Sequence, residues 1–335
     1  MKLLNDLRCA VNRNLARHER QQGQTVLAAR PQFLIIDPTS RCNARCVMCP
    51  QSFRAPGQRG VDLPRTIFDK VSPVIAGAAH INLFSTGEPT LAHDLVFLMR
   101  EALRRSNRRA PIWISTNGKH LLAPALLDVL RLPQMGLQFS VDAGSKELFE
   151  TIRRGIGFNQ LCASLDQARR LKRAHGHPAL SFSCTISKRN LHDLHRIFAL
   201  AKQHDVDQVI FYEEDPEVPE EQPFVLDQSD RPVFEAQLPF IESTAICYSN
   251  GLHFGEATLP PTDCLAPWRV FHLRADGTVR PCCTMRESLG DLSRASLDQV
   301  WNGPGFVGLR RAFLSQTRIP QVCRACTDPL RTWNP

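Results

Sequence analysis

The chain has 335 residues, of which 43% are hydrophobic and 22% charged, an ordinary composition for a globular protein. No apolar run approaches the roughly 20 residues of a membrane span, and residues 1–30 mix charges throughout, which argues against a secretory signal. We therefore expect a cytoplasmic protein. The net charge is +8, but arginine-rich stretches are usually solvated helix faces. No nucleic-acid-binding module is evident, so no nucleic-acid partner is expected.

Strand and helix patterns alternate along the first two thirds of the chain. Apolar residues at helical spacing first predict an amphipathic helix over residues 1–21. Strands are then predicted at residues 33–37, 80–84, 112–114, 136–141, 180–186 and 208–212. Helices are predicted at residues 66–75, 91–105, 123–130, 146–152, 161–174 and 191–203. Such alternation predicts parallel strands with helical crossovers, whose functional residues gather at the carboxyl ends of the strands.

The pattern changes in the last third of the chain. Residues 213–223 are acidic and rich in proline, which predicts a solvated loop. Short strands are predicted at residues 268–274 and 278–281. They flank Asp276-Gly277, a pair typical of hairpin turns. Helices are predicted at residues 296–302 and 306–314.

The first group of cysteines is the strongest functional signal. Cys42, Cys46 and Cys49 directly follow the first predicted strand, so three thiolates can converge from one loop. In a cytosolic enzyme, clustered cysteines more often bind metal or catalyse than form disulfides. Three ligands suit a four-iron cluster with one open iron, whereas a closed zinc site needs four. Three buried cysteines, or part of a zinc knot, are the alternatives and fit this spacing less well.

The stretch from Asp37 through Cys42 to Cys49-Pro50 resembles the CX3CX2C loop of the radical S-adenosylmethionine (SAM) superfamily. Met48 stands where that family has a large apolar residue near the adenine. The resemblance implies a [4Fe–4S] cluster whose open iron is chelated by S-adenosyl-L-methionine. Reduction of the cluster would yield a 5′-deoxyadenosyl radical, and the protein would supply position and exclude water.

A second motif, Gly87-Glu88-Pro89, follows the second predicted strand. It resembles the family's GGEP segment, whose backbone and acid meet the methionyl amino group. Thr86 replaces the first glycine of that segment, which leaves the backbone there less permissive. Taken alone, the tripeptide reads equally well as a turn.

Polar residues end the third and fourth predicted strands. The residues that the resemblance implies near the cofactor there are Ser115, Asn117, Ser140 and Asp142. An ordinary strand-to-helix turn is the alternative for the first pair. Arg153 matches a position whose guanidinium often holds the methionyl carboxylate, with Arg154 as the competing candidate.

A second cysteine group lies near the end of the chain and includes a terminal CX2C pair. Its spacing alone suits a closed tetrathiolate site for zinc or iron–sulfur. The pattern resembles the C-terminal SPASM or twitch region of radical SAM enzymes, here the shorter form with one auxiliary [4Fe–4S] cluster. The implied ligands are Cys264, Cys282, Cys323 and Cys326. Cys283 is expected to be a neighbouring thiol, and the four scattered cysteines to be core or incidental residues.

The resemblance implies an α/β fold, a partial (β/α)6 TIM-like barrel followed by a small α+β SPASM/twitch domain. We expect an N-terminal amphipathic helix and connector over residues 1–31. The radical SAM partial barrel is expected over residues 32–250, and the auxiliary iron–sulfur domain over residues 251–335. No membrane span is expected.

One auxiliary cluster suggests a two-electron oxidation, similar to that of the twitch-type alcohol dehydrogenases. The expected substrate is then a small polar, sugar- or cyclitol-like molecule. Glu213 and Glu214, after the sixth strand, are candidate bases by position, although a solvated acidic loop is the usual reading of such residues. A flavodoxin or ferredoxin-like electron donor is expected.

Two other functions stay open. The first is radical modification of a peptide or protein, by a maturase or by an epimerase that uses a cysteine such as Cys184 as hydrogen donor. Residues 1–31 are too short for the winged-helix domain that peptide maturases often carry. The second is a non-catalytic metal-binding module. The Gly87-Glu88-Pro89 motif and Arg153 argue against a non-catalytic role, because such a module has no need to hold the methionine end of a cofactor.

Overall fold

The computed structural model describes residues 2–53, 60–106, 110–214, 219–255, 264–324 and 326. The chain divides into two compact units, and neither is continuous in sequence. The first unit comprises Met1–Arg41, Gly60–Trp113 and Ala257–Pro335. The second unit comprises Cys42–Arg59 and Ile114–Glu256.

The strands of the first unit run in the order β10-β9-β8-β1-β2-β3. Their bounds are β1 (Phe33–Ile36), β2 (His80–Asn82), β3 (Ile112–Thr116), β8 (Val270–Leu273), β9 (Thr278–Arg280) and β10 (Gly290–Asp291). Strand β1 pairs in parallel with β2 and β8, and all four of its residues are buried. A strand covered on both faces is apolar throughout. The predicted hairpin β8–β9 is present, and it extends the edge of β1.

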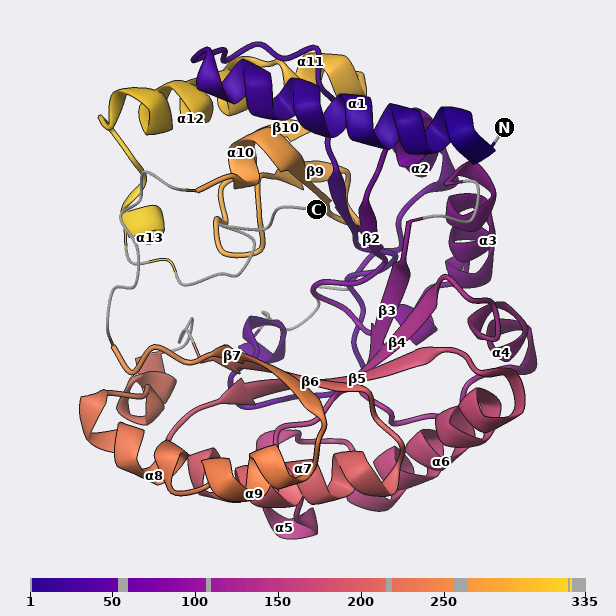
Figure 1. Ribbon diagram of the computed structural model, residues 1–335, viewed down its shortest axis with the longest axis vertical. Coiled ribbons are helices and arrows are strands. Elements are labelled where there is room, and N and C mark those ends of the chain that lie inside the picture. The colour runs from indigo at the N-terminus through magenta and orange to yellow at the C-terminus, as the bar shows by residue number, and fades with distance from the viewer. Residues whose placement is uncertain are drawn as a thin grey trace. The chain divides into compact units, whose positions relative to one another are not determined.

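Helices pack around these strands in the first unit. They are α1 (Lys2–Gln21), α2 (Arg65–Ile75), α3 (Leu95–Arg105), α10 (Ala266–Arg269), α11 (Leu297–Trp301), α12 (Pro304–Ser315) and α13 (Gln321–Arg324). Helix α1 lies along α10 (Figure 1). The side chains of Trp268, Trp301 and Phe306 are buried. The strand predicted at residues 268–274 was wrong at its start, because Trp268 and Arg269 end helix α10.

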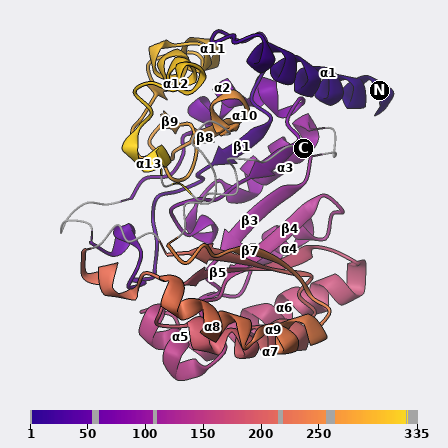
Figure 2. The ribbon, with the colours of Figure 1, turned by 60° about the vertical axis from the view of Figure 1, so that its left-hand side comes forward.

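Residues 114–116 of β3 belong to the second unit, whose strands run in the order β3-β4-β5-β6-β7. The new ones are β4 (Met135–Ser140), β5 (Ala179–Ile186), β6 (Gln208–Glu213) and β7 (Cys247–Gly251), and from β4 to β7 each pairs in parallel with the next. The helices are α4 (Pro124–Leu130), α5 (Lys146–Ile152), α6 (Phe158–His175), α7 (Leu194–Gln203), α8 (Arg231–Glu235) and α9 (Leu238–Ser243). Helices α6, α7 and α9 lie along one face of β5–β7 (Figures 1 and 2).

The two faces of this second sheet differ in character. Phe182 and Phe211 are fully buried, and Phe211 contacts Phe198 of α7, so their face is the one that the helices cover. Thr185 and Tyr212 alternate to the other face, where Thr185 is half-buried and Tyr212 is 38% exposed. A parallel sheet normally buries both faces in apolar contacts. At Thr185 and Tyr212 this face is therefore more polar and more open than the face that the helices cover.

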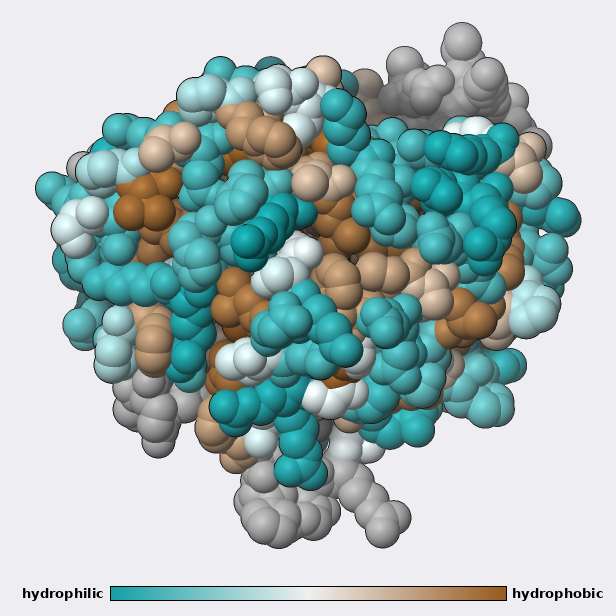
Figure 3. Space-filling view, turned by 90° about the horizontal axis from the view of Figure 1, so that it is seen from below, coloured by the Kyte–Doolittle hydropathy of each residue, from teal (hydrophilic) through white to brown (hydrophobic). Residues whose placement is uncertain are grey.

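Strand β7 and helices α8 and α9 were not predicted. Strand β7 reads Cys-Tyr-Ser-Asn-Gly, without the apolar run that marks a buried strand. Tyr248 nevertheless packs on Phe198 and Phe211. In the described part of the chain, no helix has the length and apolar character needed to span a membrane. The face shown in Figure 3 carries mostly hydrophilic side chains with apolar ones scattered between them.

Candidate active site

The cysteine loop belongs to the second unit and begins just after strand β1 in sequence. Cys42 is exposed, Cys49 is half-buried and Cys46 is buried. The carbonyl of Cys46 accepts hydrogen bonds from the Cys49 amide at 3.2 Å and from the Ser52 hydroxyl at 2.8 Å. These bonds turn the chain so that the three predicted cluster ligands stay within one short loop.

The segment of residues 152–154 forms backbone hydrogen bonds with this loop. The amides of Arg45 and Val47 donate to the carbonyls of Arg154 and Ile152, at 2.7 and 3.0 Å. Arg153, which lies between these two acceptors, brings its Nη1 to 3.9 Å from the Cys46 sulfur. Arg154 is exposed. Arg153 is thus the arginine of the pair that reaches the cysteines.

Arg153 is itself fixed by Asp142. Its Nε donates to the Asp142 carboxylate at 2.5 Å, and that carboxylate also accepts from the Thr185 amide at 2.8 Å. Burial opposes the charge on Arg153, but the charges of Asp142 and Cys46 outweigh it and raise the pKa of the guanidinium. Both Asp142 oxygens are therefore engaged in holding the cysteine loop and the end of β5. The Asn190 amide completes this support by donating to the Asp142 carbonyl at 2.7 Å.

The pKa of the Cys46 thiol reflects its burial and the charges around it. Burial raises the pKa of this thiol to about 11, Arg153 opposes the shift, and Asp142 and the other two cysteines add to it. A bound cation would oppose this shift and favour the thiolates. Among the described residues, no group of three or more metal-binding side chains is spaced for a single ion. Three cysteine thiols on one short loop are the kind of donor set that an iron–sulfur cluster takes, so their chemistry suits the predicted cluster, whose ligands stay a prediction.

The predicted polar residues after β3 and β4 lie in the same unit as the loop. The Asn117 amide donates to the Asn43 side chain at 2.8 Å, and the Lys119 ammonium to the Asn43 carbonyl at 3.0 Å. Ser115, Ser140 and Met48 are half-buried. Asn117 therefore positions the cysteine loop, a role that its place after a strand did not reveal.

The Gly87-Glu88-Pro89 loop lies in the first unit, against the backbone that follows β1. A Cβ on Gly87 would stand 2.2 Å from the Thr39 carbonyl oxygen, so only glycine fits there. The Glu88 amide donates to the Arg41 carbonyl at 2.8 Å. The Glu88 carboxylate is buried and accepts from the Thr90 hydroxyl at 2.6 Å. The close approach of Gly87 to the Thr39 carbonyl explains why the motif needs its glycine.

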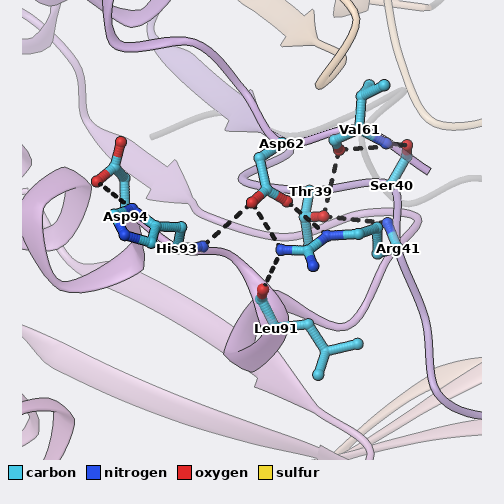
Figure 4. Close-up of polar contacts among 8 residues, drawn as sticks. All are labelled: Thr39, Ser40, Arg41, Val61, Asp62, Leu91, His93 and Asp94. Carbon is cyan, nitrogen blue, oxygen red and sulfur yellow. Dashed lines mark hydrogen bonds and ion pairs between the residues drawn. The ribbon is translucent and has the colours of Figure 1, made fainter. Parts of the chain in front are cut away.

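Side-chain contacts stiffen the segment just before Cys42 (Figure 4). The Arg41 guanidinium forms a two-point ion pair with Asp62, at 2.9 and 2.6 Å, and also donates to the Leu91 carbonyl. The Thr39 hydroxyl donates to the Val61 carbonyl at 3.2 Å. These residues fix the backbone against which the Gly87 loop rests.

The C-terminal cysteines gather in the first unit. Cys264 and Cys282 pack against a buried apolar cluster that includes Phe33 and Val270. The Cys282 sulfur accepts from the Met285 amide at 3.3 Å, and the Cys326 sulfur lies 3.7 Å from the Thr284 hydroxyl. Cys323 is half-buried in helix α13, whereas Cys283 is exposed. The ligand set Cys264, Cys282, Cys323 and Cys326 stays a prediction.

The two glutamates after β6 have different environments. Glu213 caps backbone, since its carboxylate accepts from the amides of His253 and Phe254 at 2.6 and 3.1 Å. Glu214 is only 5% exposed, and its Oε1 has no hydrogen-bond partner among the described residues. Its amide donates to the Ile186 carbonyl at 3.0 Å, which extends the β5–β6 ladder.

Burial raises the pKa of Glu214 to about 7. A hydrogen bond from Ser187 opposes this shift, while the charge of Glu221 adds to it. Glu221 is paired with Arg189 through two hydrogen bonds of 3.0 and 3.1 Å. Glu214 is therefore the glutamate of the two that combines burial, an unpartnered oxygen and a perturbed pKa.

The family model described as the radical SAM superfamily matches residues 36–220, more than half of the chain. The chain belongs to the radical SAM superfamily. A second model, SPASM, described as an iron–sulfur cluster-binding domain, matches residues 264–327. The predicted recognition and cofactor classes are confirmed, because these domains imply [4Fe–4S] clusters, including an auxiliary one.

Relatives of known name match only part of the chain. The chain is 26% identical to the AdoMet-dependent heme synthase of Methanosarcina barkeri (strain Fusaro / DSM 804), over 52% of this chain and 48% of that protein. It is 29% identical to the GTP 3',8-cyclase of Pseudomonas fluorescens (strain Pf0-1), over 56% of this chain and 55% of that protein. The chain thus spans about half the length of these curated relatives.

Solved structures share the fold more completely. Streptococcus suis SuiB bound to S-adenosylmethionine has a TM-score of 0.69 at 16% identity, covering 94% of this chain and 76% of that one. Native anSMEcpe with bound AdoMet has a TM-score of 0.64 at 19% identity, covering 89% of each chain. BtrN in complex with AdoMet and 2-DOIA has a TM-score of 0.50 at 14% identity, covering 91% of this chain and 96% of that one. These likenesses confirm the predicted fold class.

Proposed function

We propose that this radical SAM protein is an oxidoreductase that removes two electrons from a small polar, sugar- or cyclitol-like substrate, with Glu214 as general base. The observation that carries the proposal is the state of Glu214. This buried carboxyl directly follows β6 and has an unpartnered oxygen and a pKa of about 7. A general base works best when its pKa lies near the operating pH.

The cluster ligands follow from the two cysteine groups. Cys42, Cys46 and Cys49 would hold the [4Fe–4S] cluster with the open iron. The auxiliary [4Fe–4S] cluster would be held by Cys264, Cys282, Cys323 and Cys326. When bound, these clusters and S-adenosyl-L-methionine supply a 5′-deoxyadenosyl radical that takes a hydrogen atom, and an acceptor for one electron.

Oxidation of a CH–OH group to a carbonyl releases a hydrogen atom, a proton and an electron. In this proposal Glu214 takes the proton from the hydroxyl. Arg153 keeps a positive charge beside the Cys46 sulfur and holds the loop through Asp142. The polar face that carries Thr185 and Tyr212 supplies hydroxyl groups that can bind a polyhydroxylated substrate.

The remaining cofactor contacts are proposed from the matched motifs. They are Met48, Gly87, Glu88, Pro89, Ser115, Asn117, Ser140, Asp142 and Arg153. Asn117, Asp142 and Arg153 also fix the cysteine loop, as their hydrogen bonds indicate. A flavodoxin or ferredoxin-like donor in a reducing, cytosolic compartment would supply electrons.

Peptide modification is the second candidate. The solved relatives include SuiB bound to the precursor peptide SuiA as well as BtrN with 2-DOIA, so likeness of fold favours neither substrate class. An epimerase would need an accessible hydrogen donor. Cys184 has no exposed surface, and burial raises the pKa of its thiol well above the usual value. The structure therefore offers no support for Cys184 in that role.

The test is anaerobic turnover with S-adenosyl-L-methionine and dithionite. Aminocyclitols, hexoses and short peptides serve as probes, and the readouts are 5′-deoxyadenosine and a product lighter by two hydrogen atoms. We expect an oxidised cyclitol or sugar from the wild type. Glu214→Gln should still form 5′-deoxyadenosine but lose at least about a hundredfold in oxidised product, the usual worth of a general base.

Glu235→Gln is the matched control, because Glu235 is an exposed glutamate in the same unit. Oxidation by Glu214→Gln at the wild-type rate would contradict the assigned base. Modified peptide with no oxidised cyclitol or sugar would replace the proposal by the second candidate. No 5′-deoxyadenosine with any probe would favour a non-catalytic module.

A further inference from the structure

A buried carboxylate in the first unit joins three segments that are distant in sequence. Asp37, at the end of β1, has no exposed surface. Its Oδ2 accepts from the Thr86 hydroxyl at 2.8 Å and lies 3.2 Å from the Arg274 guanidinium. Its amide donates to the Leu273 carbonyl at 2.8 Å. Asp37 therefore ties the residue before Gly87 to strand β8 of the C-terminal region.

His272 extends this chain of contacts toward the auxiliary cluster. The imidazole is 1% exposed, and its Nε2 lies 3.8 Å from the Asp37 Oδ2. On its other side, Nδ1 is 3.2 Å from the Cys282 carbonyl oxygen. Because a carbonyl oxygen only accepts, Nδ1 is the donor in this bond. The imidazole thus stands between Asp37 and a proposed cluster ligand.

Two atoms of this pair are left unsatisfied. Within the described residues, His272 Nε2 and Asp37 Oδ1 have no hydrogen-bond partner. Orphaned polar atoms at such depth are costly, and apolar residues of similar size would avoid the cost. A purely stabilising role therefore explains these two residues poorly.

We infer that Asp37 and His272 are positioning residues that couple the Thr86–Gly87 loop to the auxiliary-cluster ligand Cys282. His272 sets the orientation of the Cys282 carbonyl. The Cys282 sulfur accepts a hydrogen bond from the Met285 amide at 3.3 Å. A change in the backbone orientation of Cys282 therefore alters the hydrogen bonding around this ligand sulfur. Such outer contacts tune the reduction potential of iron–sulfur clusters.

The other end of the coupling is the loop that precedes the proposed S-adenosyl-L-methionine site. Thr86 directly precedes Gly87, which packs tightly on the Thr39 backbone. A shift of this loop changes the contact between Thr86 and Asp37. The change is passed from Asp37 to His272, and from His272 to the Cys282 carbonyl. The inference rests on the cofactor sites of the proposed function, but not on its substrate or its base.

The first experiment isolates the auxiliary cluster. In a chain carrying alanine at Cys42, Cys46 and Cys49, the midpoint potential of the remaining cluster is measured by redox titration followed by electron paramagnetic resonance. His272→Phe and Thr86→Val are compared with this parent, alone and combined. Thr317→Val is the control, because within the described part of the first unit the Thr317 hydroxyl hydrogen-bonds with Ser315, away from Asp37 and His272.

We expect both variants to shift the potential, although the Thr86 hydroxyl contacts Asp37 and not Cys282. The combined variant should shift it by less than the sum, as coupled residues do. Thr86→Val replaces a hydroxyl by a methyl group of similar size. Urea unfolding is the check that this variant folds. A Thr86→Val shift no larger than that of Thr317→Val would overturn the inference.

The second experiment uses the full enzyme and measures equilibrium binding of S-adenosyl-L-methionine. Coupling is reciprocal, so His272→Phe should weaken binding even though His272 lies at the auxiliary site. The expected loss is about three- to tenfold, the worth of one buried hydrogen bond. Unchanged affinity would overturn the coupling. Neither measurement involves substrate turnover, so failure of the proposed oxidation leaves both results readable.

Discussion

The buried carboxyl of Glu214 predicts a pH-dependent gain in stability when it is replaced by glutamine. Burial raises its pKa from 4.5 to about 7 in the folded state. The folded state therefore holds a proton that the unfolded state has already lost between these two values. Wild-type stability falls across this window as pH rises, and the loss is complete above pH 7. With about 1.36 kcal/mol per pKa unit, the change from 4.5 to about 7 corresponds to a cost of about 3 kcal/mol.

Glu214→Gln removes this cost, because glutamine does not ionise. Urea unfolding at pH 5 and at pH 8 measures the difference between variant and wild type. We expect little difference at pH 5 and a gain of about 1–3 kcal/mol for the variant at pH 8. Glu235→Gln, at an exposed position of α8, is the matched control. A Glu214→Gln difference as flat with pH as that of the control would refute the reasoning.

Three further predictions concern the cofactor sites. Cys282→Ala should lower the iron of anaerobically purified protein from about eight atoms to about four, whereas Cys283→Ala, at an exposed thiol, should leave iron content unchanged. Gly87→Ala should abolish measurable S-adenosyl-L-methionine binding, because its Cβ would clash with backbone at 2.2 Å; normal binding would contradict the contact. Arg153→Ala should lower unfolding free energy by about 3–5 kcal/mol, since it leaves Asp142 buried without its partner, and Arg153→Lys should recover part of this loss.

The sequence by itself determined the features that short stretches encode. The spacing of Cys42, Cys46 and Cys49 predicted a cluster loop, and the alternation of apolar runs with helical patterns indicated the parallel α/β fold. Both are local patterns, since the period of a strand or helix and the spacing of ligands are written in consecutive residues. Strand β7 was not predicted because its sequence, Cys-Tyr-Ser-Asn-Gly, has no apolar run, although Tyr248 packs on Phe198 and Phe211.

Only the tertiary structure decided how adjacent, similar residues divide their roles. Glu213 and Glu214 look alike in sequence, yet one caps the backbone of residues 253–254 and the other is buried with an unpartnered oxygen. Arg153 and not its neighbour reaches Cys46. The contact of Asp37 with His272 joins residues 235 positions apart, through a pairing of β1 with β8 that no local pattern announces. Burial and charge at each position depend on which distant segments pack around it, and this information exists only once the chain has folded.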